Sequence, residues 1–200
     1  MPELPDVTVY VERLRARVVG QPLDRVRLGN PFVLRSVTPP LSSVETQTVR
    51  AVSRLGKRIV ITLDGHISLV IHLMIAGRLR WRDTGAPLPK GRGLAAFDFR
   101  NGTVLFTEEG TKKRASLHVV GTAAELATHD RGGLELLDAT VEQFREALTR
   151  ENHTAKRALI DPRLFSGIGN AYSDEILHAS RLSPMKLTQK LSEDEIVRLY

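Results

Sequence analysis

Cysteine is absent from the 200 residues of this chain. Its absence excludes disulfide bonds and any cysteine-ligated zinc within the chain. The 6 histidines are scattered without the spacing of a metal site, so we predict no metal ligands. Aromatic residues make up only 5% of the sequence, which argues against a surface that binds single-stranded nucleic acid by stacking.

Long apolar runs are missing as well. No run approaches the roughly 20 apolar residues that a membrane-spanning helix needs, so we expect no membrane association. Charged residues, among them Asp6 and Glu12, interrupt the beginning of the chain, which does not have the pattern of a secretory signal. We therefore expect a cytoplasmic location.

Positive charge is what the chain has in excess. The formal net charge is +6 and the isoelectric point is near 10.0, which favours a polyanionic partner. A solvated basic surface explains the same charge equally well, so charge alone does not decide. Hydrophobic residues make up 42% of the chain, enough to build a core in one large domain or two small ones.

The first part of the chain predicts one helix followed by antiparallel strands. Residues 6–19 show apolar residues at helical spacing, and Gly20 suits a helix end. Short runs rich in Val, Ile, Leu and Phe then extend to about residue 120, which indicates a sandwich or barrel. The apolar stripe is Val7, Val11, Leu14 and Val18, and the predicted hairpins are Lys57–Leu63 with Ile67–Ile71 around Asp64-Gly65 and Ala95–Arg100 with Thr103–Thr107 around Asn101-Gly102.

Helical signals dominate the last third of the chain. Thr140 with Gln143 and Ser192 with Glu195 form capping-box patterns. We predict an α+β chain in two domains: residues 1–122, a linker at 123–135, and a helical domain at 136–200. The further predicted elements are helices at 153–160 and 171–179 and a glycine-containing turn at 166–170.

The N-terminus carries a pattern with catalytic potential. Removal of Met1 would leave Pro2 with a free secondary amine, and an α-amino group ordinarily titrates near pH 8. Such an amine can attack a sugar carbon and form an iminium ion, with the carboxyl group of Glu3 available for proton transfer. Taken alone, these residues are explained more simply as the acidic, proline-containing first turn of a helix.

Further motifs give the chain a family resemblance. The N-terminal segment and several internal segments occur in the order and at roughly the spacing of the formamidopyrimidine-DNA glycosylase / endonuclease VIII family. The chain resembles this family over essentially all of its length. The matching segments are Pro2-Glu3-Leu4-Pro5-Asp6, Lys57, His72-Leu73, Gly77-Arg78-Leu79 and Gly167-Ile168-Gly169-Asn170-Ala171-Tyr172-Ser173-Asp174-Glu175.

The resemblance implies a fold and catalytic roles. It implies an N-terminal helix with an antiparallel β-sandwich, then an all-α helix–two-turn–helix domain. Pro2 would be the nucleophile at C1′ of a damaged nucleotide, Glu3 would transfer a proton at the sugar, and Lys57 would contact phosphate near the scission site. Asp6 and Glu175 match acidic positions near the lesion. Without the resemblance, Lys57 and Glu175 would be read as ordinary surface residues.

The resemblance also implies a grip on the DNA backbone. Gly169 and Asn170 lie in the turn of the helix–two-turn–helix motif, where glycine lets the backbone approach a phosphate and a helix N-terminus offers unsatisfied N–H groups. A helix connector whose glycines serve geometry alone is the simpler alternative. Lys156 matches a lysine near the damaged base, but a Lys-Arg pair on a helix is equally a solvated face.

Two segments depart from the family pattern. The family commonly fills the gap left by an extruded base with a Met, together with an Arg and a Phe from a later loop. Here Ile75 occupies the usual Met position and Met74 comes one residue early. The later loop has Lys112, Lys113 and Arg114 but no Phe, so we expect it to contact phosphate rather than to stack.

The resemblance therefore predicts a bifunctional DNA glycosylase and AP lyase that removes oxidised bases, chiefly purines, from double-stranded DNA and nicks abasic sites. We expect a cofactor-free monomer on the bacterial nucleoid. The family's four-cysteine zinc finger is absent, so we expect a C-terminally truncated chain that binds DNA weakly. A catalytically silent lesion-binding relative, or an RNA-associated protein that uses only the helical motif, remains an alternative.

Overall fold

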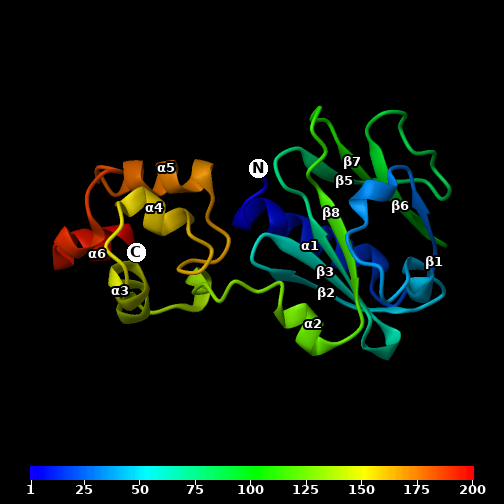
Figure 1. The fold of residues 1–200 in the computed structure, drawn as a ribbon, viewed down its shortest axis with the longest axis horizontal. Helices are drawn as coiled ribbons and strands as arrows, with labels where there is room; N and C mark the ends of the chain where they lie inside the picture. The colour runs from blue at the N-terminus through cyan, green and yellow to red at the C-terminus, as the bar shows by residue number, and fades with distance from the viewer. The chain divides into compact units, whose positions relative to one another are not determined.

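The chain divides into two units. The computed structural model describes residues 1–200 and is drawn in Figure 1. The sandwich unit contains Pro2 and residues 4–129, and the helical unit contains Met1, Glu3 and residues 130–200. The predicted α+β fold class, with a helix and a β-sandwich followed by an all-α part, is confirmed.

Helix α1 (Leu4–Val18) begins the sandwich unit and covers one side of it. Gly20 follows with a φ of +79°, a conformation that suits glycine at a helix end. The Arg15 guanidinium donates to the carbonyl oxygen of Val52 at 2.8 and 3.3 Å. None of the helices is long and apolar enough to cross a membrane. The buried residues of α1 are the predicted stripe, Val7, Val11, Leu14 and Val18.

Two four-stranded antiparallel sheets form the sandwich. Their facing sides bury a continuous apolar core, which includes three phenylalanines. The α1 stripe belongs to the same core. The first sheet has the order β1 (Leu23–Leu28), β6 (Gly93–Phe99), β7 (Gly102–Glu108), β5 (Gly77–Arg82), and the second β2 (Val49–Leu55), β3 (Arg58–Leu63), β4 (Ser68–His72), β8 (Ser116–Val120).

Both predicted hairpins are confirmed, with differences at their turns. Strands β3 and β4 are joined by residues 64–67, in which Asp64–His66 form a short 3-10 helix rather than a two-residue turn. In the second hairpin, Phe99 lies opposite Gly102, so the turn comes one residue earlier than predicted. A Cβ at Gly102 would lie 2.3 Å from the Trp81 ring. Close packing against Trp81, together with a φ of +157°, therefore requires this glycine.

The predicted linker at 123–135 contains regular structure. Ala123–Ala127 forms the short helix α2, which Thr122 caps by accepting a hydrogen bond from a backbone N–H. Further along, Leu134 forms a parallel bridge with Phe165. Most of this segment is therefore built into the fold.

The helical unit contains four α-helices, and both predicted capping boxes are present. Such boxes satisfy backbone N–H groups at the start of a helix. The helices bury their apolar sides in a core around Phe144, Leu159 and Phe165. The helices are α3 (Val141–Thr149), α4 (Ala155–Ile160), α5 (Asn170–Ala179) and α6 (Glu193–Leu199).

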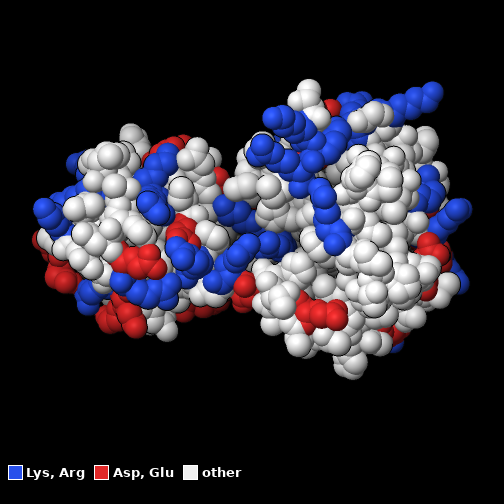
Figure 2. All heavy atoms as spheres, in the orientation of Figure 1, with Lys and Arg blue, Asp and Glu red and all other residues white.

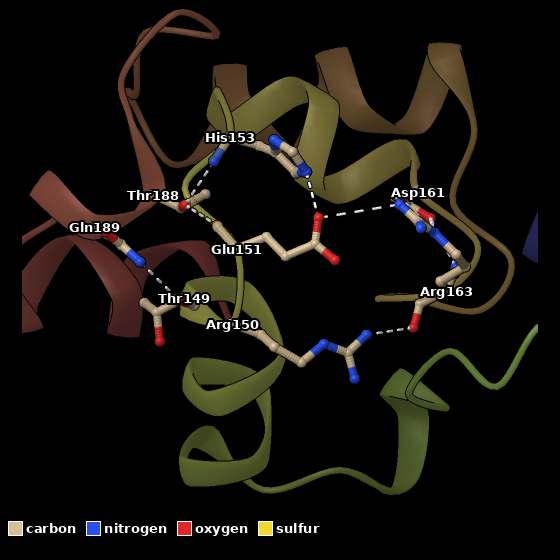
Figure 3. A network of polar contacts seen from close by, with 8 residues as sticks. All are labelled: Thr149, Arg150, Glu151, His153, Asp161, Arg163, Thr188 and Gln189. Atoms are coloured by element: carbon tan, nitrogen blue, oxygen red, sulfur yellow. Dashed lines mark hydrogen bonds and ion pairs between the residues drawn. The ribbon is translucent and has the colours of Figure 1, made fainter.

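A polar network fixes the connections around α4 (Figure 3). The Glu151 carboxylate lies 2.7 Å from Nε2 of His153 and 4.0 Å from Arg163. Arg163 also forms a 2.7 Å ion pair with Asp161, and its hydrogen bond lowers the pKa of that carboxyl group. The hydroxyl group of Thr188 donates to the carbonyl oxygen of Glu151 at 2.8 Å. The network thus joins segments before and after α4.

Replacing Gly133 by alanine tests whether the supposed linker is tightly packed. A Cβ at Gly133 would lie 2.5 Å from the carbonyl oxygen of Pro162 and 2.9 Å from the carbonyl carbon of Phe165. We expect Gly133→Ala to lower the free energy of unfolding by about 1–3 kcal/mol. Denaturant unfolding would measure it, with Gly110→Ala as control because its nearest neighbours lie at 3.6 Å. Equal stability of the two variants would contradict the prediction.

Candidate DNA-binding and catalytic site

Glu3 occupies the N-terminus of α5. Its side chain is 2% exposed. One carboxylate oxygen accepts hydrogen bonds from the N–H groups of Gly169 and Tyr172 at 2.6 and 3.1 Å, and the other accepts from Ala171 at 3.0 Å. The N-cap Gly169 has no side chain to cap the helix, so Glu3 satisfies N–H groups that would otherwise lack partners. The positive end of the helix dipole also favours a carboxylate here.

The turn before α5 departs from the expected phosphate grip. Gly167 has a φ of +86°, which explains this glycine. The N–H groups of Gly169, Ala171 and Tyr172, which a phosphate was expected to use, donate to Glu3 instead. The side chain of Asn170, the first residue of α5, is exposed. In this turn, Asn170 is therefore the better candidate for phosphate contact.

The other predicted residues of the helical unit lie on its surface. Lys156 on α4 forms an ion pair with Asp174 on α5, with 2.5 Å between ammonium nitrogen and carboxylate oxygen. Glu175, also on α5, is exposed. The pair with Asp174 restricts the Lys156 ammonium group and connects two helices.

Two predicted residues lie at the start of the sandwich unit. Pro2 is buried and Asp6 is exposed in the first turn of α1. Met1 precedes Pro2, so the Pro2 nitrogen belongs to a peptide bond until Met1 is removed. The chemistry expected of Pro2 therefore depends on that processing step.

Lys57 lies in a hairpin turn. The sequence had predicted it at the start of a strand, and that prediction is wrong. Gly56 and Lys57 connect β2 to β3, and Gly56 has the positive φ of +57° that this turn requires. Arg58 follows and lies opposite His72 on β4. The turn thus presents a lysine directly beside a strand end that carries further basic residues.

His72 is a neighbour of Lys57 that was quoted in the sequence motif but given no role. Burial, followed by the charges of Arg58, Lys57 and His118, lowers the pKa of His72 to about 4. At neutral pH it is therefore an uncharged imidazole that can donate one hydrogen bond. Strand alternation on β4 could have indicated that His72 shares a face with Arg58 across the pair.

Met74 and Ile75 lie in the turn between β4 and β5, outside the strands. Met74 has a φ of +53°, and its side chain is partly covered. The Ile75 side chain is 54% exposed. Of the two residues, Ile75 is therefore the more accessible apolar group.

The loop between β7 and β8 uses its three basic residues differently. Lys112 and Arg114 are exposed, whereas the ammonium group of Lys113 donates to the carbonyl oxygen of Glu108. A hollow of about 250 Å³ separates this loop from Ile75. On the face shown in Figure 2, Lys and Arg side chains gather over the loops of the sandwich unit. Lys112 and Arg114 are therefore the better candidates for phosphate contact, with Lys113 tied to the protein.

No group of three or more His, Cys, Asp or Glu side chains is arranged to hold a metal ion. The candidate residues fall into two sets by unit. Pro2, Asp6, Lys57, Met74, Ile75 and the 112–114 segment belong to the sandwich unit, and Glu3, Lys156, Gly169, Asn170 and Glu175 belong to the helical unit.

Comparisons with known proteins match both units. The family model described as the formamidopyrimidine-DNA glycosylase N-terminal domain matches residues 1–115, and the one described as its H2TH domain matches residues 135–200. The formamidopyrimidine-DNA glycosylase of Thermus thermophilus is 34% identical over 206 residues, covering 100% of this chain and 72% of the relative. That of Mycoplasma genitalium is 28% identical over 201 residues, covering 98% and 70%.

Solved structures of the Lactococcus lactis enzyme have the same fold. A complex with DNA containing Fapy-dG matches with a TM-score of 0.89 at 27% identity, covering 99% of this chain and 74% of that chain. A complex with DNA containing an AP site gives 0.87 at 25% identity, covering 98% and 76%. Fold and motifs together define a DNA glycosylase of the helix–two-turn–helix class. The chain belongs to the formamidopyrimidine-DNA glycosylase family.

Acidification tests the environment of His72. An unfolded histidine binds a proton near pH 6.5, whereas folded His72 does so only near pH 4. Its contribution to stability is therefore complete above pH 6.5 and is lost as pH falls toward 4. We expect the free energy of unfolding to decrease over this interval, by at most about 3 kcal/mol for this residue.

Urea unfolding near pH 7 and near pH 4.5 would measure the decrease. His72→Gln should lose less stability between the two conditions than the parent. Part of the decrease should remain, because burial lowers the pKa of His118 and His129 too. His178→Gln, at an exposed position, is the control. An identical pH dependence of the parent and His72→Gln would contradict the assignment.

Proposed function

We propose that this chain is a bifunctional DNA glycosylase and AP lyase that acts on oxidised purines, such as 8-oxoguanine and formamidopyrimidines, in double-stranded DNA. The observation that carries the proposal is the buried Glu3 carboxylate, which follows Pro2 directly and is held by three backbone N–H groups. A rigid carboxylate next to a potential amine nucleophile suits proton transfer at a sugar. We further propose a cofactor-free monomer in the bacterial cytoplasm.

The proposed reaction begins after removal of Met1. The secondary amine of Pro2 attacks C1′, the glycosidic bond breaks, and the base leaves with its bonding electron pair and a proton. The amine and C1′ then form an iminium ion, with the sugar ring opened by proton transfer through Glu3. The iminium acidifies the C2′ proton, so that its loss expels the 3′ phosphate. Water finally hydrolyses the iminium and releases Pro2.

Binding of the duplex would use separate parts of the two units. We propose that Lys57 and Asn170 contact phosphates at the damaged strand, and that Lys112 and Arg114 contact further phosphates. The exposed Ile75 would enter the space left by the extruded base, because an apolar side chain can replace lost base stacking. Asp6 and Glu175 are assigned to the lesion pocket, and Lys156 to its neighbourhood.

A catalytically silent DNA-binding relative is the second candidate. The absence of an aromatic residue from the 109–115 loop favours it, because such a loop has no ring to insert into the base stack. It predicts salt-dependent DNA binding without a covalent intermediate. Both candidates share the fold and the basic residues, so only the chemistry of Pro2 separates them.

Borohydride trapping tests the proposed nucleophile. Duplexes that carry 8-oxoguanine or an abasic site are mixed with protein whose loss of Met1 has been verified by intact mass. We expect a reduced covalent adduct with the parent. Pro2→Gly should sharply reduce it, since a flexible primary amine forms a neutral imine that must first be protonated. Glu3→Gln should slow adduct formation on 8-oxoguanine by about 100-fold or more.

The abasic duplex serves as the control for base release. Its sugar has already lost the base, so Glu3→Gln should affect trapping on it less than trapping on 8-oxoguanine. Absence of an adduct on both duplexes, from folded protein that binds DNA and has lost Met1, would favour the silent relative. An adduct that persists undiminished in Pro2→Gly would place the nucleophile elsewhere.

Salt titration of DNA binding tests the different roles of the three loop residues. Each lysine or arginine that neutralises a phosphate contributes about 0.9 to the slope of log K against log salt. Lys112→Gln and Arg114→Gln should each lower the slope by about that amount. Lys113→Gln should lower it less, because its ammonium group is bound to the Glu108 carbonyl oxygen. Equal losses for all three variants would contradict this distinction.

A further inference from the structure

Glu108 is a buried acidic residue for which the proposed reaction has no use. It is the last residue of β7, and its side chain is 1% exposed. Burying a carboxylate is costly unless hydrogen bonds compensate for the loss of water. The contacts of Glu108 therefore indicate what the carboxylate does in this position.

The carboxylate of Glu108 closes the base of the loop between β7 and β8. Both oxygens lie 3.0 Å from the backbone nitrogen of Arg114, and at 3.2 and 3.3 Å from that of Ala115. The carbonyl oxygen of the same residue accepts a hydrogen bond from the Lys113 ammonium group. Glu108 thus holds three consecutive residues, Lys113, Arg114 and Ala115, at the C-terminal end of the loop.

These contacts fix the part of the loop that faces solvent. Ala115 is 2% exposed and anchors the returning chain in the sandwich core. Between the anchors, Lys112 and Arg114 remain exposed beside the hollow that Ile75 borders. Without such anchors, the 109–115 loop would lose about 1–2 kcal/mol per residue in backbone entropy when a ligand orders it.

We propose that Glu108 is a positioning residue that preorganises the 109–115 loop for duplex DNA. This inference rests on the proposed function, in which Lys112 and Arg114 contact phosphates. Glu108 touches no DNA itself and acts by fixing the backbone of the loop before binding. Binding then requires less ordering of the loop, which increases affinity.

The sign of the effect on DNA binding tests the proposal. Removal of a negative charge ordinarily strengthens attraction to a polyanion. Glu108→Gln should instead raise the Kd for an abasic duplex by about fivefold to tenfold, because the loop loses a carboxylate that accepts from its backbone and must be ordered on binding. Glu109→Gln is the matched control, since this neighbouring carboxylate is 45% exposed and pairs with arginines on the surface. It should bind as tightly as the parent or tighter.

Two further measurements separate positioning from other causes. The salt slope of Glu108→Gln should equal that of the parent, because the phosphate contacts still form once the loop is ordered. Amide hydrogen exchange in the absence of DNA should accelerate at Arg114 and Ala115 in this variant and stay unchanged in Glu109→Gln. This second measurement does not depend on the proposed function, and trapping with the parent on the same duplex tests that function separately.

The result that would overturn the proposal is unchanged exchange at Arg114 and Ala115, or affinity that rises in both variants. A lowered salt slope in Glu108→Gln would assign the effect to lost phosphate contacts instead. If Glu108→Gln does not fold, Glu108→Asp keeps the charge but withdraws the carboxylate by one methylene group. Faster exchange at the same two amides in that variant would support the positioning role, and parental protection would contradict it.

Discussion

The candidate catalytic site depends on the three hydrogen bonds that the Glu3 carboxylate accepts at the N-terminus of α5. The helix has 10 residues, and helices of this length are marginal without outside support. Its N-cap is a glycine, so no local side chain can satisfy the first N–H groups. A residue from the start of the chain supplies the missing acceptor. The same hydrogen bonds hold the carboxylate rigidly. Glu3 follows Pro2 directly in the sequence.

This arrangement connects folding with chemistry. The helix N-terminus is an attractive place for any anion, and here a side chain of the protein already occupies three of its donors. In the proposed function, the phosphate contact in this turn is therefore assigned to the exposed side chain of Asn170. A carboxylate whose position is fixed by backbone groups needs no reorganisation during proton transfer, which is the advantage of a preorganised site.

Features that depend on nearby residues could be predicted from the sequence. The α1 stripe, the two hairpins and both capping boxes each follow from residues a few positions apart, and all are present. The resemblance supplied the family and the candidate residues. The partners of Glu3 could not be predicted, because they lie 166 to 169 residues away in the chain. The environment of His72 and the anchoring of the loop by Glu108 likewise require the packed sheets.

The contact between Arg15 and Val52 has a consequence for the edge of the second sheet. Strand β2 is at the edge of its sheet, and an exposed edge offers unpaired carbonyl groups to a strand of another molecule. The Arg15 guanidinium occupies the Val52 carbonyl oxygen, while α1 packs along the same strand. Helix α1 thus also covers part of an edge of the sandwich, where a free carbonyl group could otherwise pair with a strand of another molecule.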